Sequence, residues 1–222
     1  MKPQRKSTFE RDFGVARDKF PKLSYDLDKK RKLWVITGEL DICDRAGIYW
    51  GTFDIRIFVP QNYPHCVPVV QELSTVIPRD IDWHIDEDGF CCVDIKHRMT
   101  NDARKGINVS DFIMQKVYSF FANQLYKINH GNYAGEEYQH HFPGVAQFYR
   151  EDLGLRGEAA ILMLEGILEG WLGRNQRCPC GGSDKLKNCH LASFAFLKGL
   201  DRELLRKDLR SFMKLSDEPE TR

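Results

Sequence analysis

Cysteine is the residue type that carries the most chemical information in this chain. The 222-residue sequence holds seven cysteines, and five of them fall into two tight clusters. One cluster is the adjacent pair Cys91–Cys92. The other spans 13 residues and comprises Cys178, Cys180, Cys189 and His190. An odd count of clustered cysteines does not fit a secreted disulfide framework, so the pattern predicts metal binding or free-thiol chemistry.

The second cluster has the spacing of a zinc site. Two thiols stand one residue apart, eight residues follow, and a Cys–His pair ends the pattern. Structural zinc takes four such ligands in a tetrahedron, and Gly181–Gly182 would let the backbone turn back so that the second pair completes it. Because protein side chains fill all four places, we expect a closed, structural Zn²⁺ site that supplies folding free energy to a segment too small for its own core.

This segment resembles the SEC-C motif, named for the C-terminus of the bacterial secretion ATPase SecA. The resemblance covers about 20 residues and includes Gly173, Arg174 and Asn175 before the thiols. It implies a bacterial protein, because the motif is frequent in bacteria. The basic residues around the ligands suit docking on a protein or an acidic surface; they are Arg174, Arg177, Lys185 and Lys187.

The first cluster follows two motifs in a fixed order. Tyr63, Pro64 and Pro68 form a Tyr-Pro-x-x-x-Pro segment. A later Gly-x-x-Cys-hydrophobic-Asp-Ile run comprises Gly89, Cys92, Val93, Asp94 and Ile95. In this order and spacing, residues 7–150 resemble the ubiquitin-conjugating enzymes and their UBC fold. The resemblance implies that Cys92 accepts an activated acyl group as a thioester and passes it to an amine.

His84 stands where that family carries an asparagine. The family commonly has His-Pro-Asn, with the asparagine eight residues before the cysteine, whereas this chain has Asp82, Trp83 and His84. A neutral imidazole can donate one hydrogen bond, so His84 could polarise the thioester or stabilise an oxyanion. It could also be a general base for the incoming amine. The alternative is that His84 only pins the loop.

The two adjacent cysteines are expected to have different roles. In an extended segment they point to opposite sides, and the motif register favours Cys92 as the carrier and leaves Cys91 as a small core residue. One alternative is a second metal site made by Cys91, Cys92, His84 and His97, although the spacing is unfamiliar. Another is a thiol redox protein, for which a vicinal pair would form a strained disulfide.

The resemblance also implies partners. Bacterial homologues of ubiquitin-conjugating enzymes occur in antiphage defence operons, where the acyl group is the C-terminus of a ubiquitin-like protein or of a cGAS-like nucleotidyltransferase (CBASS systems). This chain has no Gly-rich phosphate loop, so it would depend on an activating enzyme for ATP-driven activation or work without one. The alternative function is a catalytically inactive UBC-fold adaptor with a zinc-dependent docking element. Inactive variants generally lack the cysteine, which is present here.

Hydrophobic periodicity predicts the elements that position these residues. A short amphipathic helix is expected over residues 7–20, followed by an antiparallel meander of four strands at 23–27, 33–40, 48–60 and 67–73. Residues 78–107 are expected to form a long loop, and Asn108 to cap a helix over 109–128. This order predicts an α+β, UBC-like fold. In the third strand the inward face is expected to be Phe53, Ile55, Ile57 and Val59.

The C-terminal part is expected to be helical around the zinc segment. Helical stretches are predicted over 136–150, interrupted at Pro143–Gly144, over 157–171, and over 192–215. The predicted domains are a UBC-like domain at 1–155, a connecting helix at 156–172, the SEC-C motif at 173–192, and a terminal helix and tail at 193–222.

Composition excludes several function classes. The formal net charge is +1 and 42% of residues are hydrophobic, as in ordinary globular proteins. Near-neutral charge argues against nucleic acid as a partner, because such binding needs a phosphate-neutralising excess. No stretch approaches the ~20 apolar residues of a membrane helix, and no apolar core follows the basic start. We therefore expect a cytoplasmic protein.

Overall fold

The computed structural model describes residues 7–135 and 138–217 of the chain. The chain divides into two compact units, Met1–Glu136 and Glu137–Arg222. This boundary lies before the expected one at residue 155. The reason is that Tyr149 belongs to the core of the second unit, where its buried hydroxyl donates a 2.9 Å hydrogen bond to Asp208.

The first helix, α1 (Thr8–Lys19), begins where the sequence predicts. The Ser7 hydroxyl accepts a hydrogen bond from the Glu10 amide at 3.2 Å, and the Glu10 carboxylate accepts one from the Ser7 amide at 2.6 Å. This reciprocal capping box satisfies two amides that would otherwise lack partners at a helix start. The helix buries Phe9, Phe13 and Ala16 against the sheet.

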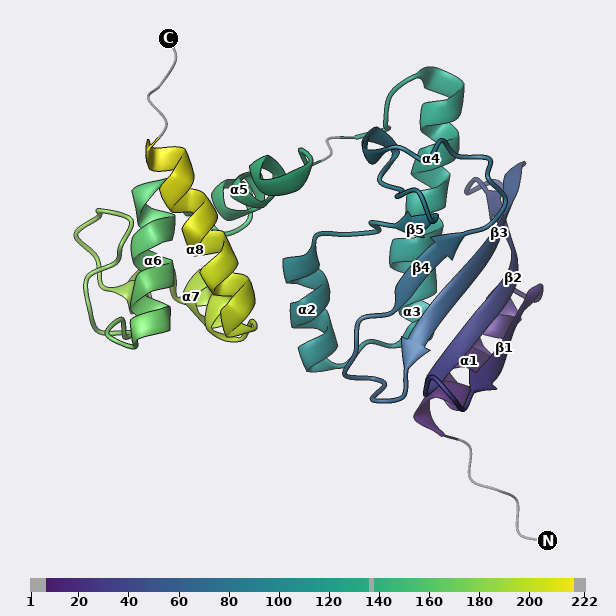
Figure 1. Ribbon diagram of the computed structural model, residues 1–222, viewed down its shortest axis with the longest axis horizontal. Helices are drawn as coiled ribbons and strands as arrows, with labels where there is room; N and C mark the ends of the chain where they lie inside the picture. Colours follow the sequence, from purple (N-terminus) through teal and green to yellow (C-terminus); the bar gives the residue numbers. More distant parts are fainter. Residues whose placement is uncertain (1–6, 136–137, 218–222) are drawn as a thin grey trace, which may run out of the picture. The chain divides into compact units, whose positions relative to one another are not determined.

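The first unit is built on a five-stranded antiparallel sheet in the order β1-β2-β3-β4-β5 (Figure 1), which confirms the α+β class. Its strands are β1 (Leu23–Asp28), β2 (Leu33–Cys43), β3 (Tyr49–Pro60), β4 (Val69–Glu72) and β5 (Phe90–Cys91). The expected inward face of β3 is confirmed, because all four of its predicted side chains are fully buried. The prediction of four strands missed β5, which pairs with β4 at Val70↔Cys91 and Gln71↔Phe90.

The expected irregular loop over 78–107 contains regular structure. It holds a 3₁₀ turn, η1 (Ile81–Trp83), then β5, then α2 (Lys96–Lys105). The prediction of a continuous loop was wrong because α2 is a strongly polar helix: it buries His97 and Asn101 as well as Met99 and Ala103. A two-residue strand is also too short to show a period.

The long helix after Asn108 is confirmed. It runs through α3 (Val109–Phe112), a π-helical segment η2 (Ile113–Tyr118) and α4 (Ser119–His130). The Asn108 side chain accepts hydrogen bonds from the amides of Ser110 at 2.9 Å and Asp111 at 3.2 Å, as an N-cap does. The long helix buries one apolar face, which comprises Ile113, Val117, Phe120, Phe121 and Leu125.

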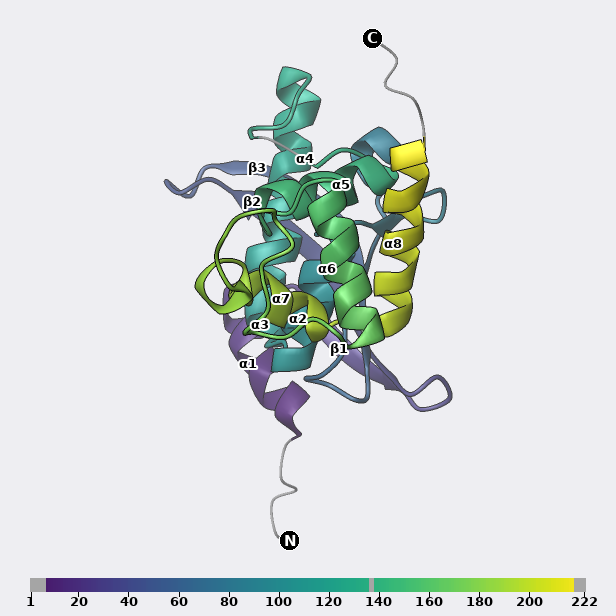
Figure 2. The same ribbon diagram turned by 90° about the vertical axis from the view of Figure 1, so that its left-hand side faces the viewer.

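The second unit is helical around an irregular segment (Figure 2). Its elements are α5 (His141–Glu151), α6 (Glu158–Glu169), the 3₁₀ turn η3 (Leu186–Asn188), α7 (Leu191–Lys198) and α8 (Arg202–Asp217). Pro143 does not interrupt α5, because it lies in the first turn, where its missing amide hydrogen is not needed. The predicted helix start at Glu136 lies outside the described residues.

The single helix predicted over 192–215 is two helices. α7 ends at Lys198, and the Asp201 carboxylate accepts hydrogen bonds from the amides of Glu203 at 2.8 Å and Leu204 at 3.2 Å, which starts α8.

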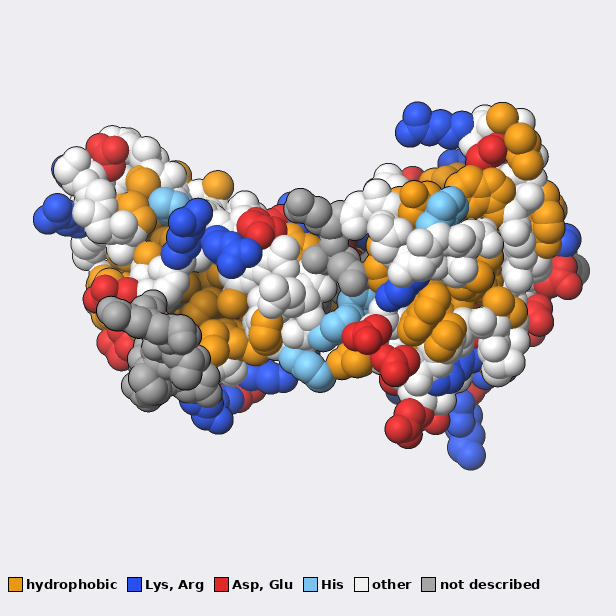
Figure 3. Space-filling view, turned by 90° about the horizontal axis from the view of Figure 1, so that it is seen from above, with side chains coloured by type: hydrophobic (Ala, Val, Ile, Leu, Met, Phe, Trp, Pro, Cys, Tyr) orange, Lys and Arg blue, Asp and Glu red, His pale blue; other side chains and the backbone are white. Residues whose placement is uncertain are grey.

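Within residues 7–135 and 138–217, no helix has the length and apolarity needed to cross a membrane. Acidic and basic side chains both occur on the visible face of each unit (Figure 3), in keeping with the net charge of +1.

Candidate active site and candidate metal centre

Gly89 begins the short segment that carries the adjacent cysteines. Its φ is +85°, and a Cβ there would lie 2.5 Å from the Glu72 carbonyl oxygen. The strand partner comes this close because the Glu72 amide donates a 2.8 Å hydrogen bond to the Gly89 carbonyl. Before it, the Asp86 carboxylate accepts hydrogen bonds from the amides of Asp88 and Phe90, which tightens the turn. Glycine is therefore required for β5 to form beside β4.

The structure separates the two adjacent cysteines by exposure. Cys91 lies in β5 and is partly buried, and desolvation raises the pKa of its thiol to about 12. Cys92 follows the strand and is exposed. Its Sγ lies 3.8 Å from the Asp94 carbonyl oxygen. Of the pair, Cys92 is thus the thiol that a macromolecular partner could reach.

His84 and Cys92 lie next to each other through their backbones. The Cys92 amide donates a 2.8 Å hydrogen bond to the His84 carbonyl, and the bridge Ile85↔Cys91 continues this pairing. His84 has left-handed backbone angles, with φ 52° and ψ 32°, and its ring centroid is 6.0 Å from that of Tyr133. The residue eight positions before the cysteine is therefore brought to it in space.

Asp94 connects the cysteine loop to the long helix. Its carboxylate forms ion pairs with Lys116 of η2 and, at 3.7 Å, with Arg98 of α2. It also accepts a 2.7 Å hydrogen bond from the Ile95 amide. Desolvation, and secondly the negative charge of Asp94, raise the pKa of the Cys92 thiol. Cys92 is therefore mostly protonated at neutral pH and less nucleophilic than an activated cysteine.

A metal site around Cys92 is not formed by the described residues. Across 7–135 and 138–217, the one group of histidine, cysteine and acidic ligand atoms close enough for a metal ion lies in the second unit. His97, a candidate for the alternative site, is buried on α2.

That group is the predicted C-terminal cluster. The ligand atoms of Cys178, Cys180, Cys189 and His190 all lie within 4.8 Å of one another. His190 Nδ1 is 3.3 Å from Cys178 Sγ and 3.1 Å from Cys189 Sγ. The Sγ atoms of Cys180 and Cys189 are 3.5 Å apart. Bonds of about 2.0–2.3 Å to a tetrahedral metal give ligand separations of roughly 3.3–3.8 Å, so the four atoms can hold a metal ion.

Backbone hydrogen bonds around the cluster bring the Cys178–Cys180 pair close to the Cys189–His190 pair. The Cys178 amide donates to the Asp184 carbonyl at 2.9 Å, and the Leu186 amide donates to the Gln176 carbonyl at 2.8 Å. Gly181 allows the return with a φ of +84°. The Gly182 amide lowers the pKa of Cys180, which favours the thiolate that a metal requires.

A contact that the sequence did not reveal orients the histidine. His190 Nε2 lies 3.2 Å from the Gly154 carbonyl oxygen, which comes from the loop between α5 and α6. With Nε2 protonated and donating to this carbonyl, Nδ1 is free to ligate the metal, as is usual for metal-bound histidine. Gly154 has a φ of +68°, and a Cβ there would lie 2.9 Å from Nε2. Thirty-six residues separate the two, so no local motif marks the pair.

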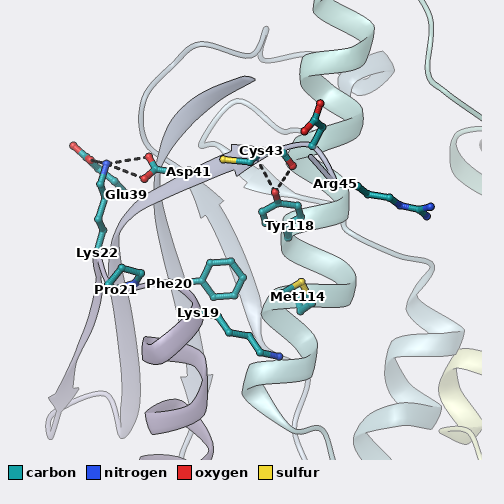
Figure 4. Close-up of a pocket in the computed structure, with 11 residues that line it drawn as sticks. Lys19, Phe20, Pro21, Lys22, Glu39, Asp41, Cys43, Arg45, Met114 and Tyr118 are labelled. Atoms are coloured by element: carbon teal, nitrogen blue, oxygen red, sulfur yellow. Dashed lines mark hydrogen bonds and ion pairs between the residues drawn. The ribbon is translucent and has the colours of Figure 1, made fainter. Parts of the chain in front are cut away.

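A pocket of about 430 Å³ lies in the first unit between the end of α1, β2 and η2 (Figure 4). Phe20, Met114 and Cys43 contribute to its lining. The Tyr118 hydroxyl contacts both the amide and the carbonyl of Cys43, and Lys22 pairs with Glu39 and Asp41. These polar groups already bind one another, and Cys92 and His84 do not line the pocket.

No protein-family model matches the chain, and neither a curated protein nor a solved structure matches it.

Proposed function

We propose that the chain is a ubiquitin-conjugating-enzyme-like acyl carrier with a UBC-like first unit. The observation that carries the proposal is the exposed residue Cys92, whose backbone amide donates a 2.8 Å hydrogen bond to the carbonyl of His84. The order of the unit supports it: one helix, an antiparallel meander, a cysteine-bearing segment after Gly89 and a long helix. This is the order that the motif resemblance implies.

The proposed reaction has two balanced steps. The Cys92 thiolate attacks an acyl carbon held as a thioester on a partner, a new C–S bond forms, and the partner's sulfur leaves as a thiolate. An amine then attacks the Cys92 thioester, a C–N bond forms and Cys92 leaves as a thiolate. The amine loses one proton, for which the His84 imidazole is the candidate base, and His84 is also the candidate donor to the oxyanion.

The acyl donor in this proposal is the C-terminus of a ubiquitin-like protein or of a cGAS-like nucleotidyltransferase, in bacterial antiphage defence. The raised pKa of Cys92 suits a carrier in that a mostly protonated thiol reacts little with electrophiles other than the bound acyl donor. The same raised pKa is the observation that favours the second candidate, an inactive UBC-fold adaptor.

We propose that the metal of the second unit is zinc and that its role is structural. Three thiols and one imidazole are a typical zinc ligand set, and four protein ligands leave no open position for a substrate. The metal would close a segment that contributes few buried apolar side chains of its own, so zinc binding would supply its folding free energy.

The proposal is tested by expressing the chain with its neighbouring genes and separating the products on a non-reducing gel. We expect a thiol-sensitive adduct in the wild type and in Cys91→Ala, and none in Cys92→Ala. An adduct that persists in Cys92→Ala would overturn the assignment. A folded wild type that forms no adduct with any neighbouring product would favour the adaptor.

A further inference from the structure

The backbone of the turn that carries His84 is held at three successive carbonyl groups. The Asp82 carbonyl accepts a hydrogen bond from the Lys127 ammonium, and the Trp83 carbonyl accepts one from the Gln124 amide at 2.9 Å. The third carbonyl, that of His84, accepts the Cys92 amide. The first two donors come from α4, which is far from the turn in sequence but adjacent to it in space.

Aromatic rings complete the attachment. The Lys127 ammonium lies over two aromatic rings, 4.6 Å from the centroid of Trp83 and 4.2 Å from that of Tyr133. The Tyr133 hydroxyl lies 3.3 Å from the Asp82 carbonyl oxygen and 3.2 Å from Gln124 Oε1. Gln124 is fully buried, so its amide is a fixed anchor.

This attachment has a conformational consequence. His84 has φ 52°, in the left-handed region that residues with a Cβ seldom adopt. Such a conformation persists only when its surroundings hold it. The contacts at Asp82 and Trp83 fix the two peptide units immediately before His84, and the Cys92 amide fixes the one after it.

We infer that Gln124, Lys127 and Tyr133 are positioning residues that hold the His84 turn against Cys92. Gln124 and Lys127 donate to the carbonyls of Trp83 and Asp82, and the Tyr133 hydroxyl lies 3.3 Å from the latter, so all three act on the backbone of the turn. Any effect on catalysis rests on the proposed function. The clamp, meaning the attachment of these three residues to the turn, does not depend on that function. Loosening the clamp would release both the imidazole of His84 and the carbonyl that binds the Cys92 amide.

The test is amide hydrogen exchange of peptides covering residues 82–92 in the full chain. We expect Lys127→Met to speed exchange there by about tenfold, because it removes the ammonium from two rings and one carbonyl. Lys127→Arg keeps a cation and should remain closer to the wild type. Lys105→Met, on the exposed end of α2, is the matched control and should leave these peptides unchanged.

Unchanged exchange at 82–92 in Lys127→Met would overturn the inference, and so would equal acceleration throughout the first unit, which would mean general destabilisation. Where the thioester reaction is reconstituted, Lys127→Met should slow transfer from Cys92 to the amine more than it lowers the amount of thioester formed. Because exchange needs no acyl partner, a failed carrier proposal and a failed clamp give different results.

Discussion

The amide of Cys92 donates a 2.8 Å hydrogen bond to the carbonyl of His84, eight residues earlier in the chain. This contact fixes the backbone distance between the exposed thiol and the turn that carries the imidazole. Because the hydrogen bond joins the turn to the end of β5, we expect a substitution that shifts the backbone of one of the two residues to displace the backbone of the other.

The first prediction concerns the reactivity of Cys92 towards iodoacetamide. Because its pKa is raised, the thiol is protonated over a wider pH range, so alkylation should be slower at pH 8 than for an ordinary cysteine and should still rise at higher pH. Asp94→Asn removes the charge that contributes to the raised pKa and should speed alkylation at pH 8. The rate is measured by mass spectrometry of the Cys92 peptide.

Asp26→Asn, which removes an exposed carboxylate on β1, is the control and should leave that rate unchanged. Slower alkylation in Asp94→Asn would contradict the sign of the electrostatic argument.

A second prediction concerns Gly89. An alanine there would have to adopt a φ of +85° with its Cβ 2.5 Å from the Glu72 carbonyl oxygen, so Gly89→Ala should destabilise the first unit by about 2 kcal/mol or more. Gly47→Ala shares the positive φ, at +81°, but its Cβ meets no atom within 4 Å. Measured by urea unfolding, Gly47→Ala should lower the free energy of unfolding clearly less than Gly89→Ala. Equal losses would show that the contact between the added Cβ and the Glu72 carbonyl does not determine the effect.

A third prediction concerns metal content. Metal analysis of the purified chain should give about one ion per chain, and Cys189→Ser should lose it, because one corner of the tetrahedron is removed. Cys43→Ser changes a cysteine of the other unit and should keep the ion. Full metal retention in Cys189→Ser would refute the ligand assignment. Loss of the metal in both variants would indicate that the substitutions disturb the whole fold and not the site alone.

The fourth prediction concerns the orientation of His190. Gly154→Ala would place a Cβ 2.9 Å from Nε2 and displace either the ring or the carbonyl that binds it, so metal affinity should fall by about 10–100-fold in competition with a chelator. Gly170→Ala, at the end of α6, has a φ of +83° with no atom within 4 Å of the added Cβ. It should bind metal as the wild type does.

The sequence predicted those features that depend on neighbouring residues. The Asn108 cap and the inward face of β3 follow from local patterns, and both are confirmed. The metal cluster was also predictable, since its ligands lie within 13 residues and their spacing restricts the possible geometry. The resemblance singled out His84 because it lies eight residues before Cys92; the hydrogen bond between the two backbones was not predicted.

The remaining features depend on distant contacts. β5 is only two residues long, and it exists because Gly89 can approach β4, so no period in the sequence marks it. α2 is too polar to show an apolar face. Gly154 and Lys127 bind backbone or ring partners more than 35 residues away, and only the folded chain shows that they do so.

The central claim, that Cys92 carries an acyl group, is tested most directly by trapping that group. A serine in Cys92→Ser would convert the thioester into an oxygen ester, which resists thiols and is cleaved by mild base. With the neighbouring genes co-expressed, the account predicts an adduct in Cys92→Ser that survives reductant, is lost in base, and maps to residue 92 by peptide mass spectrometry. An adduct that maps to another residue, or a wild type and a variant that both remain unmodified, would contradict it.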